Sequence, residues 1–247
     1  MAAADIFDDI QDADAADSLW RQCGLSTASN VGAFLLFLTQ LAITRLSRRG
    51  VSPEKVAEIV RLFAAAGAQG CCGQQLDLEQ SAYLPVSEEQ YLTVVARKSA
   101  SLVECACRSG ALLATADPEV IAACAQCGFN IGMALQILND LAGITTESAD
   151  RSDLSIGKWT LPLIFARECS PEPIHKELHS LLFAHRSCPL SLEEADRARA
   201  LLAAIGAFQY AIVVADVYWE RALSCIERAG CLAGSPLHEL VAQMRGS

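Results

Sequence analysis

Residues 128–144 read GFNIGMALQILNDLAGI, an apolar run that carries Gln136, Asn139 and Asp140 within one helical turn. Its length and its lack of strand-like alternation predict a helix that is buried over most of its surface. Polar groups at this density in a buried helix need hydrogen-bond partners, so we expect the helix to face a polar site. A helix end with a solvated Asn-Asp pair is the alternative, and it leaves Gln136 unexplained.

On both sides of this helix, the sequence contains patterns that are typical of helix starts. The segments SPE at 52–54 and DPE at 117–119 place a capping side chain before a proline at the first helical position. Ser87 and Ser191 open capping-box sequences, whereas alternating strand patterns and Asn-Gly turns are missing. With no linker and no internal repeat, the sequence predicts one all-α domain over residues 1–247, a single helical bundle. We expect its helices near residues 2–20, 27–49, 53–82, 88–115, 118–146, 158–184, 192–229 and 236–245.

The composition excludes several classes of protein. Of the 247 residues, 52% are apolar and 19% are charged, which is too apolar for a disordered chain. The formal net charge of −10 argues against a surface that binds nucleic acid. The longest apolar run, residues 31–38, continues to Ile43 only past Thr39 and Gln40, so we expect no transmembrane segment. There is no secretory signal, and the eleven cysteines include one pair with zinc-like spacing, Cys124 and Cys127, without the second pair that zinc needs. We therefore expect a cytoplasmic protein whose cysteines are small buried hydrophobes.

An acidic stretch, DIFDDIQDAD, occupies residues 5–14 near the N-terminus. On a helix, Asp5, Asp12 and one of the pair Asp8–Asp9 share a face. Like charges at that spacing cost about 0.2–0.5 kcal/mol per pair. A bound Mg²⁺, which takes one or two carboxylates together with substrate phosphates, would remove the repulsion. An acidic first turn stabilised by the helix dipole explains the charges equally well, so the spacing alone leaves both interpretations open.

Five segments, in order along the chain, resemble the motifs of the trans-isoprenyl diphosphate synthase family, also called polyprenyl synthetases. Residues 8–12 (DDIQD) are similar to its first aspartate-rich motif, and residues 72–78 (CGQQLDL) to its Gly-Gln-x-Leu-Asp-Leu segment. Residues 98–100 (KSA) are similar to its Lys-Thr-Ala motif. Residues 136–143 resemble the helix with the second aspartate-rich motif, and residues 153–162 (DLSIGKWTLP) the loop after it. Each segment alone is weak, whereas the ordered set is specific.

The resemblance implies the isoprenoid-synthase fold, the class I terpenoid synthase type. It implies a Mg²⁺-dependent prenyltransferase that ionises an allylic prenyl diphosphate and condenses it into a longer isoprenoid diphosphate. The implied metal ligands are Asp8, Asp9, Asp12, Asn139 and Asp140. The implied catalytic residues are Asp8, Asp12, Lys98 and Asp140. The implied substrate-binding residues are Lys98, Gln136, Lys158, Gln74 and Arg21.

The sequence departs from the family pattern in three places. The chain begins a few residues before the first motif, so it lacks the helices that normally carry a Gly-Gly-Lys-Arg segment for the homoallylic co-substrate, and its true start is expected upstream. An arginine pair after the first motif is replaced by Arg21 alone. The second motif reads NDLAG at 139–143, with acids missing at its first and fifth positions. Fewer charges there imply weaker binding of one Mg²⁺.

These departures leave two other functions open. Asn139, Gly143 and Glu147 have the spacing of the metal triad of class I terpene cyclases, so a cyclase or a prenyl diphosphate hydrolase with one substrate is an alternative. A non-catalytic partner subunit of a full-length synthase is another. With no preceding helices, the apolar sides of Ile6, Phe7 and Ile10 are expected to lack cover, so the chain either dimerises through this edge or is less stable than a version extended upstream. We therefore expect a homodimer.

Overall fold

The structure, a computed structural model, describes residues 2–12, 18–79, 85–145, 154, 157–183, 190–230 and 236–246. Within these ranges it contains helices and no strand, which confirms the predicted all-α fold. Its elements are α1 (Ala2–Gln11), α2 (Leu19–Cys23), α3 (Leu25–Thr44), the 3₁₀ turn η1 (Arg45–Arg49), α4 (Pro53–Glu79), α5 (Glu88–Val95), the π-helical turn η2 (Ala96–Ala100), α6 (Ser101–Ala114), α7 (Pro118–Thr145), α9 (Leu161–Cys169), α10 (Glu172–Phe183), α11 (Leu192–Ala204), α12 (Ala207–Arg228) and α13 (Pro236–Gly246).

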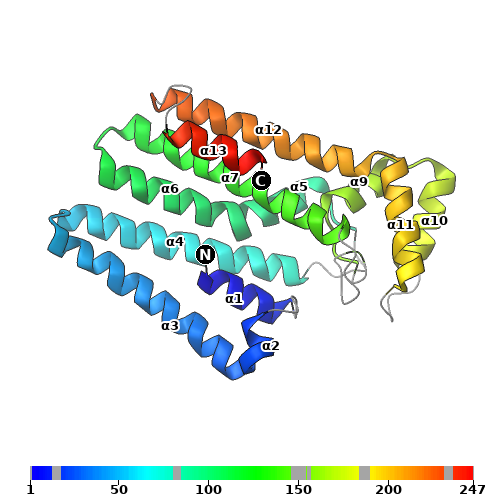
Figure 1. Cartoon of the computed structure of the whole chain (residues 1–247), viewed down its shortest axis with the longest axis horizontal. Coiled ribbons are helices and arrows are strands. Elements are labelled where there is room, and N and C mark those ends of the chain that lie inside the picture. The colour runs from blue at the N-terminus through cyan, green and yellow to red at the C-terminus, as the bar shows by residue number, and fades with distance from the viewer. Residues whose placement is uncertain are drawn as a thin grey trace.

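The long helices lie side by side in one bundle, with α3 at one edge and α12 at the other (Figure 1). The central helix is α7, which packs along α6 on one side and α12 on the other. Fully buried apolar side chains from several helices meet around it, among them Ile137, Leu161, Leu202 and Trp219. The helix that contains residues 128–144 is therefore the core of the fold, as its sequence predicts.

The predicted helix starts are confirmed where a local cap specifies them. Ser87 accepts a hydrogen bond from the backbone of Gln90, whose side chain accepts one from the backbone of Ser87. Ser191 and Glu194 form the same reciprocal pair at the start of α11. Such caps satisfy backbone N–H groups that have no partner inside the helix, so the capping residue fixes where the helix begins.

Several predicted helices are broken in two. The segment predicted as 158–184 is interrupted at Pro171, because proline cannot donate its backbone nitrogen and clashes with the preceding turn. The segment predicted as 192–229 is interrupted at Gly206, which has a left-handed backbone with φ of 77°, and α11 and α12 meet at a bend of 62°. The segment predicted as 88–115 changes to a π-helical turn at residues 96–100. The segment predicted as 2–20 is represented by α1 and the start of α2, and residues 13–17 between them lie outside the described residues.

Helix α3 is the most exposed long helix of the described bundle. Together with η1 it forms one of two stretches, Leu25–Arg49 and Pro118–Thr145, that are long and apolar enough to cross a membrane by length and composition. The bent pair α11–α12 would be a third. The prediction that no segment has this length is therefore wrong. Thr39 does not interrupt the apolar helix, because its hydroxyl donates to the carbonyl of Leu35 at 2.8 Å and is satisfied within the helix.

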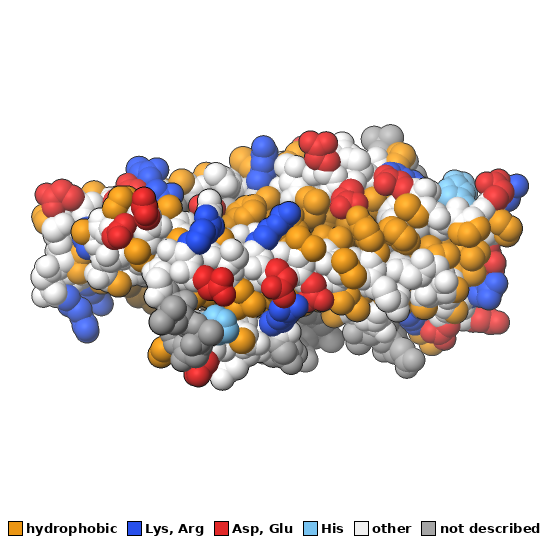
Figure 2. Space-filling view, turned by 90° about the horizontal axis from the view of Figure 1, so that it is seen from above, with side chains coloured by type: hydrophobic (Ala, Val, Ile, Leu, Met, Phe, Trp, Pro, Cys, Tyr) orange, Lys and Arg blue, Asp and Glu red, His pale blue; other side chains and the backbone are white. Residues whose placement is uncertain are grey.

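The two stretches differ in how much of them the bundle covers. Half of the apolar window of α7 is buried, as suits a core helix, whereas 11% of the window of α3 is buried. Large side chains exposed on α3 are Leu25, Phe34, Leu36, Phe37, Leu38 and Leu41. Helix α12 also exposes apolar side chains, Ile212, Val213 and Val217. Seen from the α12 side, apolar side chains form a band between charged ones (Figure 2).

Two further expectations need correction. Phe7 is not without cover, since its ring packs against α3 so closely that a Cβ atom at Gly32 would lie 2.8 Å from it. Among the described cysteines, Cys127 and Cys225 are buried, but four others are exposed: Cys23, Cys71, Cys72 and Cys169. The prediction that the cysteines serve as buried hydrophobes is wrong for these four.

Candidate functional site

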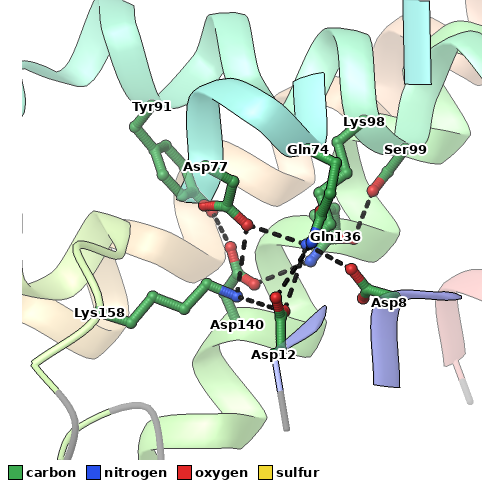
Figure 3. Close-up of polar contacts among 10 residues, drawn as sticks. All are labelled: Asp8, Asp12, Gln74, Asp77, Tyr91, Lys98, Ser99, Gln136, Asp140 and Lys158. Atoms are coloured by element: carbon green, nitrogen blue, oxygen red, sulfur yellow. Dashed lines mark hydrogen bonds and ion pairs between the residues drawn. The ribbon is translucent and has the colours of Figure 1, made fainter. Parts of the chain in front are cut away.

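The ammonium group of Lys98 binds carboxylates from two helices (Figure 3). Lys98 Nζ lies 2.8 Å from Asp8 Oδ1 and 3.5 Å from Asp12 Oδ2. It also lies 2.9 Å from Asp77 Oδ2. Asp8 is on α1, Asp12 directly follows the last residue of that helix, and Asp77 is near the end of α4. The lysine of η2 therefore links the C-terminal end of α1 to the C-terminal end of α4.

Lys158, in the segment before α9, brings a second cation to the same carboxylates. Its Nζ lies 3.8 Å from Asp77 Oδ2 and 3.9 Å from Asp12 Oδ2. Gln74 Nε2 donates a hydrogen bond of 3.0 Å to the other oxygen of Asp12. We call Asp8, Asp12, Asp77, Lys98 and Lys158 the charged cluster. In it, cationic and anionic groups alternate over a few ångströms, which favours the binding of a polyanion that arrives together with a metal cation.

A chain of hydrogen bonds, buried at Tyr91 and Asp140 and part-buried at Gln136 and Ser99, lies beside the charged cluster. The Tyr91 hydroxyl donates to Asp140 Oδ2 at 2.7 Å, and Gln136 Nε2 donates to Asp140 Oδ1 at 2.8 Å. The Ser99 hydroxyl donates to Gln136 Oε1, which fixes the orientation of that amide. Two of the polar residues of the apolar helix, Gln136 and Asp140, thus have the hydrogen-bond partners that their burial requires.

Burial and charge shift the pKa values of these groups in directions that follow from their surroundings. Burial lowers the pKa of Lys98, but the carboxylates of Asp77, Asp8 and Asp12 outweigh it, and the net shift is upward. Burial raises the pKa of Asp12, and the lysines oppose this only in part. Burial also raises the pKa of Asp140, against Lys158 and its two hydrogen-bond donors. Carboxylates with raised pKa values next to fixed cations are typical of functional sites.

The structure brings most of the predicted site residues together. Asp8, Asp12, Lys98 and Lys158 are in the charged cluster, Gln74 binds it, and Gln136 and Asp140 lie beside it. Asp9 is half-buried on α1, between Asp8 and Asp12.

Two predicted residues lie elsewhere. Arg21 is exposed on α2, where its guanidinium stacks over the ring of Trp20 at 5.0 Å. Asn139 is exposed on α7, whereas its neighbour Asp140 is buried. Glu147 and Asp153 lie outside the described residues.

Three residues of the site were not among those predicted. Asp77 lies in a segment with a recognisable motif and three residues after Gln74, a spacing that puts both on one helix face. Tyr91 precedes Lys98 by seven residues, so both fall on one face of the predicted helix. Ser99 is part of the Lys-Ser-Ala segment, but its partner on α7 is not readable from the sequence.

The donor set of the charged cluster fits a hard divalent cation. Asp8, Asp12 and Asp77 offer carboxylate oxygens, the ligands that Mg²⁺ prefers. The buried Oε1 of Gln74 has no hydrogen-bond partner among the described residues, so a further oxygen is available next to Asp12. As they stand, no three acidic, His or Cys side chains of the described residues converge closely enough to hold an ion alone.

Comparisons with known proteins show which family the chain resembles. The model of a family described as polyprenyl synthetase matches residues 2–198. The short chain isoprenyl diphosphate synthase of Methanothermobacter thermautotrophicus is 31% identical over 189 residues, which cover 72% of this chain and 56% of that protein. The geranylgeranyl diphosphate synthase of Mycobacterium tuberculosis is 30% identical over 234 residues, which cover 91% of this chain and 65% of that protein. The chain thus spans between half and two thirds of the length of these curated relatives.

Solved structures agree on the fold. The geranylgeranyl pyrophosphate synthetase from Pyrococcus horikoshii superimposes with a TM-score of 0.82 at 24% identity, covering 99% of this chain and 76% of that one. The family match covers most of this chain and every residue of the charged cluster. The chain belongs to the polyprenyl synthetase family.

Proposed function

We propose that this protein is a Mg²⁺-dependent prenyltransferase that lengthens an allylic prenyl diphosphate. The observation that carries the proposal is the charged cluster, in which α1, α4, η2 and the segment before α9 bring two lysines and three carboxylates together beside a buried apolar helix. Two of its relatives are named as a short chain isoprenyl diphosphate synthase and a geranylgeranyl diphosphate synthase, which supports the proposal.

Each part of the site has a role in this reaction. Asp8 and Asp12 would hold the metal, which would neutralise the leaving diphosphate so that its carbon–oxygen bond can ionise. Lys98 and Lys158 donate charge-assisted hydrogen bonds to diphosphate oxygens. The Ser99–Gln136–Asp140–Tyr91 chain holds a fixed set of dipoles beside them. Buried apolar side chains of α7, such as Ile137 and Leu141, exclude water that would quench a cation.

One assay separates this proposal from its competitors. The protein is incubated with Mg²⁺ and an allylic prenyl diphosphate, with and without isopentenyl diphosphate. A longer diphosphate that forms only with both substrates supports prenyl transfer. A hydrocarbon or alcohol from the allylic substrate alone supports a cyclase or hydrolase, although Asn139 is exposed rather than joined to the charged cluster. No turnover by this chain, with turnover restored by a full-length synthase partner, supports the subunit.

We further propose that the protein is a homodimer that buries the apolar face of α3. Four of its exposed side chains, Phe34, Phe37, Leu38 and Leu41, recur at helical spacing and lie on one face. Exposed apolar patches of this kind mark interaction sites. In sedimentation velocity we expect a dimer for the wild type and a monomer for Phe37→Glu. Leu192→Glu, at an equally exposed leucine on α11, is the matched control and stays dimeric; a monomeric wild type contradicts the proposal.

A further inference from the structure

The turn that carries Lys98 differs from the helices on either side of it. Residues Ala96–Ala100 form a single π-helical turn between α5 and α6. Such turns are rare and occur mostly at functional sites. Because a π-helical turn is wider than an α-helical one, successive side chains on it diverge less in direction. Here Lys98 reaches Asp8 and Asp77, while its neighbour Ser99 reaches Gln136 on α7.

The backbone of this turn packs closely against two glycines on neighbouring helices. A Cβ atom at Gly73 on α4 would lie 2.4 Å from Lys98 N and 2.8 Å from Lys98 Cα. On the opposite side, a Cβ atom at Gly132 on α7 would lie 2.6 Å from Ala100 Cα. These neighbours are backbone atoms, which cannot swing aside as the end of a flexible side chain can. Either substitution therefore has to change the spacing between the turn and the helix that carries the glycine.

We infer that Gly73 and Gly132 are positioning residues that hold the π-helical turn so that Lys98 meets the bound diphosphate. The inference rests on the proposed function, since it assigns these glycines a role in diphosphate binding. Lys98 is 13% exposed and binds three carboxylates, so a shift of its backbone by an ångström breaks contacts that are already at hydrogen-bond distance.

Two other glycines serve as matched controls, one for a methyl group added to α4 and one for crowding in a tightly packed part of α7. Gly70 lies one turn before Gly73 on α4 and faces the same segment, but its Cβ atom would be 3.8 Å from Lys98 O, an ordinary contact. Gly128 on α7 is as tightly packed as Gly132, with its Cβ atom 2.7 Å from Val103 O. Its neighbours are on α6, outside the π-helical turn. Gly128→Ala therefore reports the cost of crowding without a direct effect on Lys98.

The test is calorimetric binding of inorganic pyrophosphate in the presence of Mg²⁺, with thermal unfolding of every variant. Gly73→Ala and Gly132→Ala are expected to weaken pyrophosphate binding at least about tenfold. Gly70→Ala is expected to bind as the wild type does. Gly128→Ala is expected to lower the unfolding temperature but to bind within about threefold of the wild type. In a Lys98→Gln background, Gly73→Ala is expected to cause little further loss, because the glycine acts through the lysine.

Several results would overturn the inference. Wild-type affinity in Gly73→Ala, or an equal loss of affinity in Gly128→Ala, would show that the glycines serve packing alone. The glycines would also serve packing alone if Gly73→Ala and Gly132→Ala failed to fold while Gly128→Ala folded. Additive losses of pyrophosphate affinity in the Gly73→Ala, Lys98→Gln double variant would likewise show that the glycine does not act through the lysine. A wild-type protein that binds no pyrophosphate would instead contradict the proposed function, and this inference with it.

Discussion

Lys98 Nζ lies 2.8 Å from Asp8 Oδ1, so the lysine of the π-helical turn is a counterion of the first aspartate-rich motif. The same ammonium group is the proposed ligand of the substrate diphosphate. On the proposed function, binding of substrate and metal would be an exchange, in which Asp8 would give up Lys98 to hold the metal and Lys98 would donate to the diphosphate instead. This exchange predicts that Mg²⁺ and a diphosphate each strengthen the binding of the other.

Lys98→Gln tests the exchange. Removing the cation leaves Asp8 without this counterion and leaves Asp77 with Lys158 as its nearby cation, so we expect Mg²⁺ alone to bind more tightly than in the wild type. We expect pyrophosphate binding to weaken by about 1.5–3 kcal/mol, the value of a hydrogen bond to a charged group. Both affinities are measured by calorimetry. Arg97→Gln, at an exposed neighbour on the same turn, is the control; if Mg²⁺ alone binds no more tightly to Lys98→Gln than to this control, the exchange is wrong.

Asp140→Asn is expected to stabilise the folded protein at neutral pH. Burial raises the folded-state pKa of Asp140 above its ordinary value of 3.8. The stability that its protonated form contributes is therefore complete below pH 3.8 and is lost as the pH rises through the folded-state pKa. Asparagine resembles the protonated form at every pH. In urea unfolding, the free energy of unfolding of Asp140→Asn should exceed that of the wild type at pH 7, and the difference should shrink as the pH falls toward 4. A difference that is constant with pH would contradict a raised folded-state pKa of Asp140.

Tyr91→Phe is expected to lower the free energy of unfolding at pH 7 by about 1.5–3 kcal/mol, because it removes a donor from a buried carboxylate. The loss should be smaller in an Asp140→Asn background, where the oxygen that loses its donor is uncharged. Tyr210→Phe removes a hydroxyl that donates to the partly exposed Glu88 at 2.7 Å, and its cost should be lower. Equal losses in the two single variants would mean that burial of Asp140 does not matter.

The sequence predicts those parts of the fold that short segments specify. The capping boxes at Ser87 and Ser191 begin helices where expected, because the cap and the backbone groups that it satisfies lie within four residues. The break at Pro171 is also local, and the residue itself is the signal that the predicted helix 158–184 overlooks. The π-helical turn has no such signal, since Gly73 and Gly132, which hold it, are on other helices.

The site is predictable to a similar extent. The carboxylates of Asp8 and Asp12 share a helix face by spacing alone, so their joint role follows from the sequence. The bond between Tyr91 and Asp140 joins positions 49 residues apart, and neither residue indicates its partner. Asn139 and Asp140 are adjacent in the motif, yet only Asp140 is buried, because successive residues on a helix point in different directions.

The most direct test of the proposed function is the transfer of labelled isopentenyl diphosphate onto an allylic prenyl diphosphate in the presence of Mg²⁺. The wild type is compared with Asp12→Ala, which removes a carboxylate that both lysines approach. We expect label in a longer prenyl diphosphate with the wild type, and a rate lower by about 10²–10³-fold with Asp12→Ala, the usual cost of losing one electrostatic group of an active site. A fully active Asp12→Ala protein, or a wild type that transfers no label, would contradict the proposal.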